Sequence, residues 1–196
     1  MNTLVIATRN HGKLLEFTNI LKRGSLEIVS LDNFPYYDVQ EDGKSFRENA
    51  LIKAKAAVDK TGFPALADDS GLEVLALEGK PGIFSARFAG EAATDAANVK
   101  KLLDMMKDIP MEDRQARFVC SLALVFPDGK LFVENGYLEG YVTYKPKGEM
   151  GFGYDPILFI PRYKKTVAEL LPEEKNSISH RAKALEKMKK HVLKYL

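Results

Sequence analysis

Two long apolar segments, residues 118–126 and 131–142, are separated only by Pro127-Asp128-Gly129-Lys130. Each of these residue types favours a tight turn for its own reason. Pro fixes the backbone angle φ, the Asp side chain accepts a hydrogen bond from the nearby backbone, and Gly adopts positive φ without steric cost. The pattern predicts a β-hairpin with long antiparallel strands. Any sheet that contains this hairpin is mixed rather than purely parallel, which excludes the all-parallel α/β folds.

The remaining sequence alternates between strand and helix patterns. Residues 4–7 are typical of a buried strand, and the spacing of Leu14, Phe17 and Leu21 predicts a helix over 13–21. Ser45-Phe46-Arg47-Glu48 forms a capping box that starts a helix reaching about residue 60. The later predictions are a helix capped by Thr94 with Leu102, Leu103 and Met106, a strand over 157–160, a short helix opened by 166–169, and a terminal helix from about Ser177. We therefore expect an α/β fold with a mixed, twisted sheet.

Composition limits the class of protein. The chain of 196 residues is long enough for one domain, 1–196, or for two lobes that share a sheet. With Cys120 as the single cysteine, no intramolecular disulfide forms, which indicates a reducing, cytoplasmic setting. The N-terminus lacks a signal-peptide pattern, and the apolar runs are shorter than a membrane span. Because 29 Lys and Arg balance 27 Asp and Glu, stable nucleic-acid binding by bulk charge is not expected.

The segment Thr8-Arg9-Asn10-His11-Gly12-Lys13 is a polar turn between the first strand and the first helix. A helix N-terminus attracts a phosphate through its unpaired N–H groups and its dipole. The same dipole disfavours the cation of Lys13 in the first turn unless an anion lies nearby. We interpret the segment as a phosphate site, with an ordinary loop capped by Asn10 as the alternative.

Asp68 and Asp69 follow a short apolar run and precede Ser70-Gly71, so we expect the pair to interrupt a strand. Neighbours in an extended chain point to opposite faces, so only one carboxylate faces inward unless the chain turns at Ser70-Gly71. A hard cation such as Mg²⁺ would relieve the repulsion, and Glu41 is the upstream carboxylate we select as its second ligand. The alternative is a solvated acidic turn. These residues do not decide which aspartate faces inward.

Two later segments carry side chains suited to a planar base. Glycines flank Phe152 in residues 148–156, which frees its ring for stacking, and Asp155 can accept base N–H groups. The alternative is a tight loop that packs Phe152 into its own core. His180 and Arg181 again place cationic donors at a helix start, where an anion would be favoured.

In this order, the segments resemble the inosine triphosphate pyrophosphatase family over nearly the whole chain. The motifs that carry the resemblance are Thr8–Lys13, Phe46–Ala50 with Lys53, Ala67–Leu72, Pro81–Arg87, Gly151–Pro156 and Ser179–Arg181. The resemblance implies two lobes around a central cleft, Mg²⁺ dependence and a homodimer. It also implies hydrolysis of deaminated purine nucleoside triphosphates such as ITP, dITP and XTP to a monophosphate and pyrophosphate, which would cleanse the nucleotide pool.

The resemblance also assigns roles. Asp69 would be the catalytic base and, with Glu41, would contact the metal ion, while Ser70 would contact the substrate. The residues expected to hold the triphosphate are Thr8, Arg9, Asn10, His11, Gly12, Lys13 and Lys53. Those expected at the base are Phe152, Gly153, Tyr154, Asp155, Lys175, His180 and Arg181. Donors in this pocket match the C6 carbonyl of hypoxanthine and xanthine and oppose the amino group of adenine, whereas the exclusion of guanine does not follow from these side chains.

Two other functions remain open on the sequence. One is a pyrophosphatase for other modified nucleotides, which a panel of substrates would distinguish. The other is a non-catalytic nucleotide or RNA-binding module that uses the lysine-rich face of the terminal helix. The second reading gives no reason for the aspartate pair or for the Phe152 loop.

Overall fold

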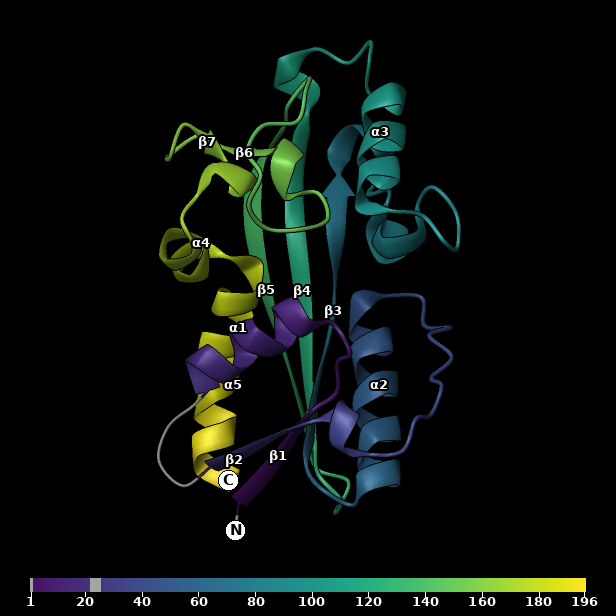
Figure 1. Ribbon diagram of the computed structural model, residues 1–196, viewed down its shortest axis with the longest axis vertical. Helices are drawn as coiled ribbons and strands as arrows, with labels where there is room; N and C mark the ends of the chain where they lie inside the picture. The colour runs from purple at the N-terminus through teal and green to yellow at the C-terminus, as the bar shows by residue number, and fades with distance from the viewer. Residues whose placement is uncertain (1, 22–25) are drawn as a thin grey trace. The chain divides into compact units, whose positions relative to one another are not determined.

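The computed structural model describes residues 2–21 and 26–196, and its strands form one mixed sheet in the order β2-β1-β3-β4-β5-β6-β7 (Figure 1). The strands are β1 Asn2–Ile6, β2 Leu26–Ser30, β3 Ala65–Val74, β4 Gln115–Val125, β5 Leu131–Val142, β6 Leu158–Ile160 and β7 Lys165–Thr166. β1 pairs in parallel with β2 and β3, whereas β6 is antiparallel to both β5 and β7. The predicted mixed α/β sheet is confirmed.

The helices are α1 His11–Leu21, α2 Phe46–Thr61, α3 Asp95–Met105, α4 Pro172–Ile178 and α5 His180–Tyr195. The predicted terminal helix is wrong at its start, because two helices occupy this stretch. Ser179, at φ −61° and ψ 154°, ends α4 in extended backbone, and α5 begins at the next residue. His180 and Arg181 therefore open a helix, as the argument from the dipole assumed.

The predicted hairpin turn and the predicted cap at Ser45 are both present. The N–H of Phe126 bonds the carbonyl of Lys130 where β4 meets β5, as the hairpin prediction requires. Ser45 caps α2 by accepting the N–H of Glu48. The Glu48 carboxylate accepts the N–H of Lys44 rather than that of Ser45, so the predicted capping box is wrong in its second half.

The chain divides into two compact units, which are described separately. Unit 1 comprises residues 1–69, 120–136 and 180–196, and unit 2 comprises residues 70–119 and 137–179. β3, β4 and β5 each contribute residues to both units. The expectation of a single domain with two lobes around a cleft stays a prediction.

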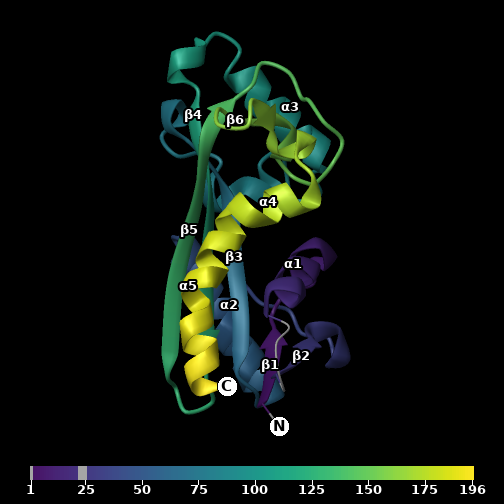
Figure 2. The ribbon, with the colours of Figure 1, turned by 90° about the vertical axis from the view of Figure 1, so that its left-hand side faces the viewer.

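In unit 1 the sheet is covered on both faces. Leu4, Ile6 and Leu66 point to one face, where they pack with α1 and α5. Val5 and Ala67 point to the other face, where they pack with α2. Figure 2 shows α5 in front of these strands and α2 behind them. Because both faces are buried, alternate residues of β3 reach two different helical environments.

The buried face of α2 is built from small residues. Ala50, Ala54 and Ala57 are fully buried against the sheet. Small side chains let a helix lie close to the strands that it covers, so the polar side chains that neighbour these alanines come within reach of β3. Gly62 ends the helix in the left-handed region at φ 73°, with its N–H bonded to the carbonyl of Val58.

Unit 2 has its own core. Val99, Leu102 and Met106 of the α3 region pack on Leu72 and Val74 of β3, with further apolar residues from β4, β5 and β6. Thr94 caps α3 by accepting the N–H of Ala97, as predicted. None of the helices in the described ranges has the length and apolar character needed to cross a membrane.

Candidate active site

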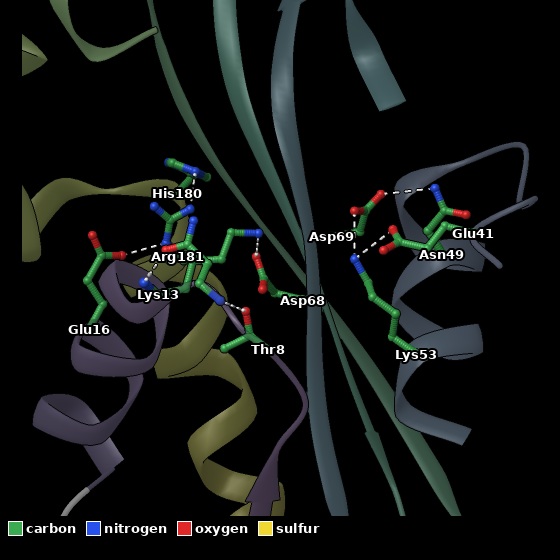
Figure 3. Close-up of polar contacts among 11 residues, drawn as sticks. Thr8, Lys13, Glu16, Glu41, Asn49, Lys53, Asp68, Asp69, His180 and Arg181 are labelled. Carbon is green, nitrogen blue, oxygen red and sulfur yellow. Dashed lines mark hydrogen bonds and ion pairs between the residues drawn. The ribbon is translucent and has the colours of Figure 1, made fainter. Parts of the chain in front are cut away.

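The aspartate pair lies inside β3, which runs without interruption from Ala65 to Val74. The expectation that the pair interrupts the strand is therefore wrong, and the chain does not turn at Ser70-Gly71. Both aspartates are buried, at 2% and 9% exposure, and they point to opposite faces of the sheet (Figure 3). Both aspartates therefore face the interior, Asp68 toward α1 and Asp69 toward α2.

On the face covered by α1 and α5, Asp68 forms an ion pair with Lys13, with 2.8 Å between Oδ2 and Nζ. Burial raises the pKa of Asp68, but the charges of Lys13, Lys53 and Arg181 outweigh burial and hold that pKa well below its usual range. Lys13 therefore has its compensating anion within the protein. This carboxylate accounts for a cation in the first turn of α1.

The Thr8–Lys13 segment is tied to itself by two short-range hydrogen bonds. Thr8 Oγ1 accepts the N–H of Asn10, and Asn10 Oδ1 accepts the N–H of Lys13. Asn10 thus caps α1, as the alternative interpretation of this segment predicted. His11 and Gly12 are exposed at the start of the helix. Arg9 pairs with Asp32 at 3.7 Å and lies over the ring of Tyr36 at 4.5 Å.

Arg181 is held on the same face, at the start of α5. It is 3% exposed, its Nε donates to Glu16 of α1, and its Nη1 lies 3.1 Å from His180 Nε2. Burial lowers the pKa of Arg181, but Glu16 and Asp68 raise it by more. A permanently charged guanidinium is thus fixed between α1 and β3 (Figure 3).

On the opposite face, Asp69 meets two donors from α2. Lys53 Nζ lies 2.9 Å from Asp69 Oδ1, and Asn49 Nδ2 lies 3.2 Å from Asp69 Oδ2 (Figure 3). Lys53 Nζ also lies 2.9 Å from Glu41 Oε2. One ammonium therefore bridges the two carboxylates that the family resemblance assigned to a metal ion.

Burial and neighbouring charges act in opposite directions on the pKa values of Lys53 and Asp69. Burial lowers the pKa of Lys53, but Asp69, Asp68 and Glu41 outweigh it and raise that pKa overall. Burial also raises the pKa of Asp69, an effect that the charge of Lys53 and the hydrogen bond from Asn49 only partly offset. A carboxylate with a raised pKa is a better proton acceptor than an ordinary aspartate.

The donor set suits a hard cation that brings other oxygen ligands with it. Glu41 and Asp69 already share one positive charge, that of Lys53. Among residues 2–21 and 26–196, no group of three or more His, Cys, Asp and Glu side chains is placed to hold a metal ion. Mg²⁺ typically takes one or two carboxylates and completes its shell with water and substrate phosphates. The two carboxylates fit that pattern.

In unit 2, the Phe152 loop is anchored by a buried ion pair. Asp155 Oδ2 accepts the N–H of Phe152 at 2.9 Å and lies 2.9 Å from Lys175 Nζ. That ammonium also lies over the Phe152 ring, 4.7 Å from its centroid. Gly151 has φ 86°, and a Cβ there would lie against the Asp155 carboxylate, so only glycine fits.

The neighbours of Phe152 complete the loop. Gly153 donates its N–H to Asp95, the first residue of α3. Tyr154 is buried and donates its hydroxyl to the carbonyl of Ser85, and burial raises its pKa. Phe152 lines a cavity of about 760 Å³ between α3 and residues 144–156. Its ring is half-buried rather than enclosed in the core of unit 2, so the alternative of a core-packing loop does not hold.

The structure thus gathers the predicted residues into two groups. Unit 1 holds Thr8, Arg9, Asn10, His11, Gly12, Lys13, Glu41, Lys53, Asp69, His180 and Arg181, and unit 2 holds Ser70, Phe152, Gly153, Tyr154, Asp155 and Lys175. Within unit 1, the cations of Lys13 and Lys53 lie on opposite faces of β3, each paired with an aspartate.

Comparison with known proteins identifies the family. The sequence profile of the Ham1 family matches residues 4–191. This chain belongs to the Ham1 family. The resemblance inferred from its motifs is confirmed by relatives that bear the name dITP/XTP pyrophosphatase. One, from Desulforamulus reducens, is 51% identical over 185 residues, covering 94% of this chain and 92% of that protein. Another, from Geobacter sulfurreducens, is 50% identical, covering 98% and 97%.

Solved structures of Ham1 proteins share the fold. The HAM1 protein of Coxiella burnetii matches with a TM-score of 0.92 and 41% identity, covering 99% of this chain and 100% of that one. A protein from Mycobacterium abscessus, described as nucleoside-triphosphatase / dITP/XTP pyrophosphatase, matches with a TM-score of 0.80 and 46% identity, covering 95% and 98%. These likenesses extend over essentially the whole chain of this Ham1 protein.

Sequence reasoning gave no role to three residues that organise these groups, although one of them, Asn49, lies in the Phe46–Ala50 motif. Asn49 bonds Asp69, Glu16 holds Arg181, and Asp95 holds Gly153. Of the three, only Asn49 could have been found from the sequence, because it lies four residues before Lys53 and therefore on the same face of the helix. Glu16 and Asp95 lie in helices far from their partners in the sequence, and no local pattern indicates these contacts.

The Asp68–Lys13 ion pair should make the melting temperature of the protein depend on pH in the acid range. Because the folded-state pKa of Asp68 lies below its unfolded value, its stabilising contribution is present above about pH 4 and is lost as the pH falls further. We expect Asp68→Asn to lower the melting temperature at pH 7, since Lys13 loses its partner, and to flatten the decline of melting temperature below about pH 4. Thermal unfolding of both proteins between about pH 3 and pH 7 measures this. Parallel acid declines would contradict the assignment.

Proposed function

We propose that this Ham1 protein is a Mg²⁺-dependent pyrophosphatase that hydrolyses dITP, XTP and ITP to the monophosphate and pyrophosphate. The observation that carries the proposal is the pair of adjacent aspartates on opposite faces of β3, each joined to a lysine of a covering helix. Relatives about half identical in sequence, and named for this activity, support it. Removal of such nucleotides would keep them out of DNA and RNA synthesis.

On the α1 face, the chain offers the groups that bind a polyphosphate. Lys13 contributes a charge, and the first turn of α1 contributes N–H groups and the positive end of its dipole. Asp68 fixes where the Lys13 ammonium lies. Thr8 and Asn10 close the loop, so the backbone that faces the phosphates is already ordered before binding.

On the α2 face, Asp69 is the proposed general base. It accepts a proton from a water molecule whose oxygen bonds the α-phosphorus, and the bond from that phosphorus to the bridging oxygen breaks to release pyrophosphate. Glu41 and Asp69 would hold Mg²⁺, which when bound neutralises the charge that develops on the phosphate oxygens. Lys53 adds a permanent positive charge beside the same carboxylates.

In unit 2, the Phe152 ring and the Lys175 ammonium are the proposed contacts to the purine. The ring offers a stacking surface, and the ammonium offers a donor to the C6 carbonyl of hypoxanthine or xanthine. Adenine presents an amino group at C6, so two donors would meet and the site would lose a hydrogen bond. Asp155 orients both contacts through its bonds to Lys175 and to the Phe152 backbone.

We also propose that the protein acts as a homodimer. A groove lined by residues of β3, β4 and β5 and by Leu75 lies in unit 2, where Leu75 is 73% exposed. The Glu73–Arg117 ion pair lies in the same groove, with Arg117 over the Tyr137 ring. Apolar, aromatic and arginine side chains together are typical of protein interfaces. Light scattering should give about twice the 21.9 kDa of one chain, and a monomer would refute the proposal.

A substrate panel tests the activity. We expect pyrophosphate release from ITP, dITP and XTP that requires Mg²⁺, with far slower release from ATP. A clear preference for methylated nucleotides or dUTP would favour the alternative pyrophosphatase. Salt-sensitive RNA binding without any turnover would favour the non-catalytic module. Either result would overturn the proposal.

A further inference from the structure

Asn49 carries no charge, and it links the Asp69 carboxylate to the chain segment that bears Glu41. Its Nδ2 donates to Asp69 Oδ2 at 3.2 Å, and its Oδ1 accepts the N–H of Gly43 at 2.9 Å. Gly43 lies two residues after Glu41. A single amide therefore spans from β3 to the segment that carries the second carboxylate.

Asn49 and Lys53 act on Asp69 as a pair. They lie four residues apart on one face of α2, and each donates to a different oxygen of the carboxylate. The plane of the carboxylate is therefore fixed by two donors from one rigid helix. Whichever cation lies near Oδ1, the amide of Asn49 continues to hold Oδ2.

The Asn49 side chain is 2% exposed, and the space around it is filled. A Cβ at Gly43 would lie 2.5 Å from Asn49 Oδ1, so no other residue fits there without moving the segment. The close approach fixes the chain at residue 43, and with it the path that leads back to Glu41.

We propose that Asn49 is a positioning residue that keeps the carboxylates of Asp69 and Glu41 within reach of one divalent cation. This inference rests on the proposed Mg²⁺-dependent activity. It predicts that loss of the amide weakens metal binding and slows turnover more than it weakens nucleotide binding. Residues that orient metal ligands in this way typically contribute 10- to 100-fold to affinity or activity.

The chain contains a matched control in Asn98. Like Asn49, it is the fourth residue of its helix and 2% exposed, and it too joins the helix to a neighbouring segment. It accepts the N–H of Ala89 and donates to the carbonyl of Ala86, and both partners are backbone groups. Asn98→Leu therefore removes an equally buried amide that touches no proposed metal ligand.

The experiment compares the wild-type protein with Asn49→Leu, Gly43→Ala and Asn98→Leu. Mn²⁺ binding without nucleotide is measured by the loss of the free-ion electron paramagnetic resonance signal, and ITP hydrolysis gives kcat and KM. We expect Asn49→Leu to weaken Mn²⁺ binding about 10- to 100-fold and to lower kcat, with KM for ITP changed less than about threefold. Gly43→Ala keeps the Asn49 amide but forces residue 43 and that amide apart, so it should weaken Mn²⁺ binding in the same direction.

Asn98→Leu should lower the melting temperature while Mn²⁺ binding stays within about threefold of wild type. If Asn49→Leu and Gly43→Ala bind Mn²⁺ as wild type does, or if Asn98→Leu weakens binding equally, the inference is wrong although the activity stands. If the wild-type protein itself fails to hydrolyse ITP with Mg²⁺, the proposed function falls, and the inference falls with it.

Discussion

Asp69→Asn should lower kcat for ITP hydrolysis by about 10²- to 10⁴-fold, the range that a general base contributes. Asn has the size of Asp and can still accept a hydrogen bond from Lys53, but its amide does not take a proton from water. The wild-type Asp69 is 9% exposed, and its carboxylate is held in place by Lys53 and Asn49. Steady-state kinetics with ITP at saturating Mg²⁺ measures the loss.

A second aspartate controls for the loss of one negative charge elsewhere on the chain. Asp128, in the turn between β4 and β5, accepts the N–H of Lys130 and is far in sequence from every proposed site residue. We expect Asp128→Asn to keep kcat within about twofold of wild type. The melting temperature of Asp69→Asn should stay close to that of wild type, because Lys53 keeps its ion pair with Glu41 and burial disfavours the charge of Asp69. Near-normal turnover by folded Asp69→Asn would exclude Asp69 as the base.

Much of the fold followed from local signals in the sequence. The turn at Pro127–Lys130 and the caps at Ser45 and Thr94 were predicted because each depends on residues within four positions of one another. Such contacts form wherever the chain permits them, so composition and spacing suffice. The break at Ser179 left no comparable signal, and the two final helices were read as one.

The path of β3 shows where local reasoning fails. Asp68, Asp69, Ser70 and Gly71 have a composition that favours a turn, yet the strand continues through all four. Just beyond them, Leu72 donates its N–H to the hydroxyl of Ser85, which is distant in the sequence. Each aspartate forms an ion pair with a lysine of a covering helix. Tertiary partners outweigh local propensity here. The prediction was right that neighbouring side chains of a strand point to opposite faces. Because β3 is continuous, this alternation places Asp68 and Asp69 on opposite faces of the sheet.

The site residues divide in the same way. Local patterns identified Lys13 and the Asp68–Asp69 pair, because a cation at a helix start and paired acids stand out in a sequence, whereas Lys53 was indicated only by the family resemblance. They did not identify Glu16, which lies 165 residues from Arg181. A residue that acts only through a partner brought close by folding has no local pattern to reveal it.

Lys175→Met should reduce the preference for ITP over ATP, measured as the ratio of kcat/KM values, by about 10- to 100-fold. A hydrogen bond from a charged donor contributes about 1.5–3 kcal/mol, and hypoxanthine alone would gain it here. Met keeps the length and apolar stem of Lys, so the Phe152 ring retains a neighbour. The substitution also leaves Asp155 with its buried charge but without the lysine, which costs about 3–5 kcal/mol of folding stability.

A double variant separates recognition from stability. Asp155→Asn combined with Lys175→Met removes both charges, and Asn keeps an acceptor for the N–H of Phe152. Replacing both members of a buried pair by neutral residues is often close to neutral for stability, so the melting temperature should recover. The preference for ITP should stay low, because the donor is still missing. Lys165→Met, which removes an exposed lysine paired with Glu174 at 3.6 Å, serves as the control and should keep the wild-type ratio. If the double variant discriminates between ITP and ATP as wild type does, Lys175 supports the loop alone and the base is recognised elsewhere.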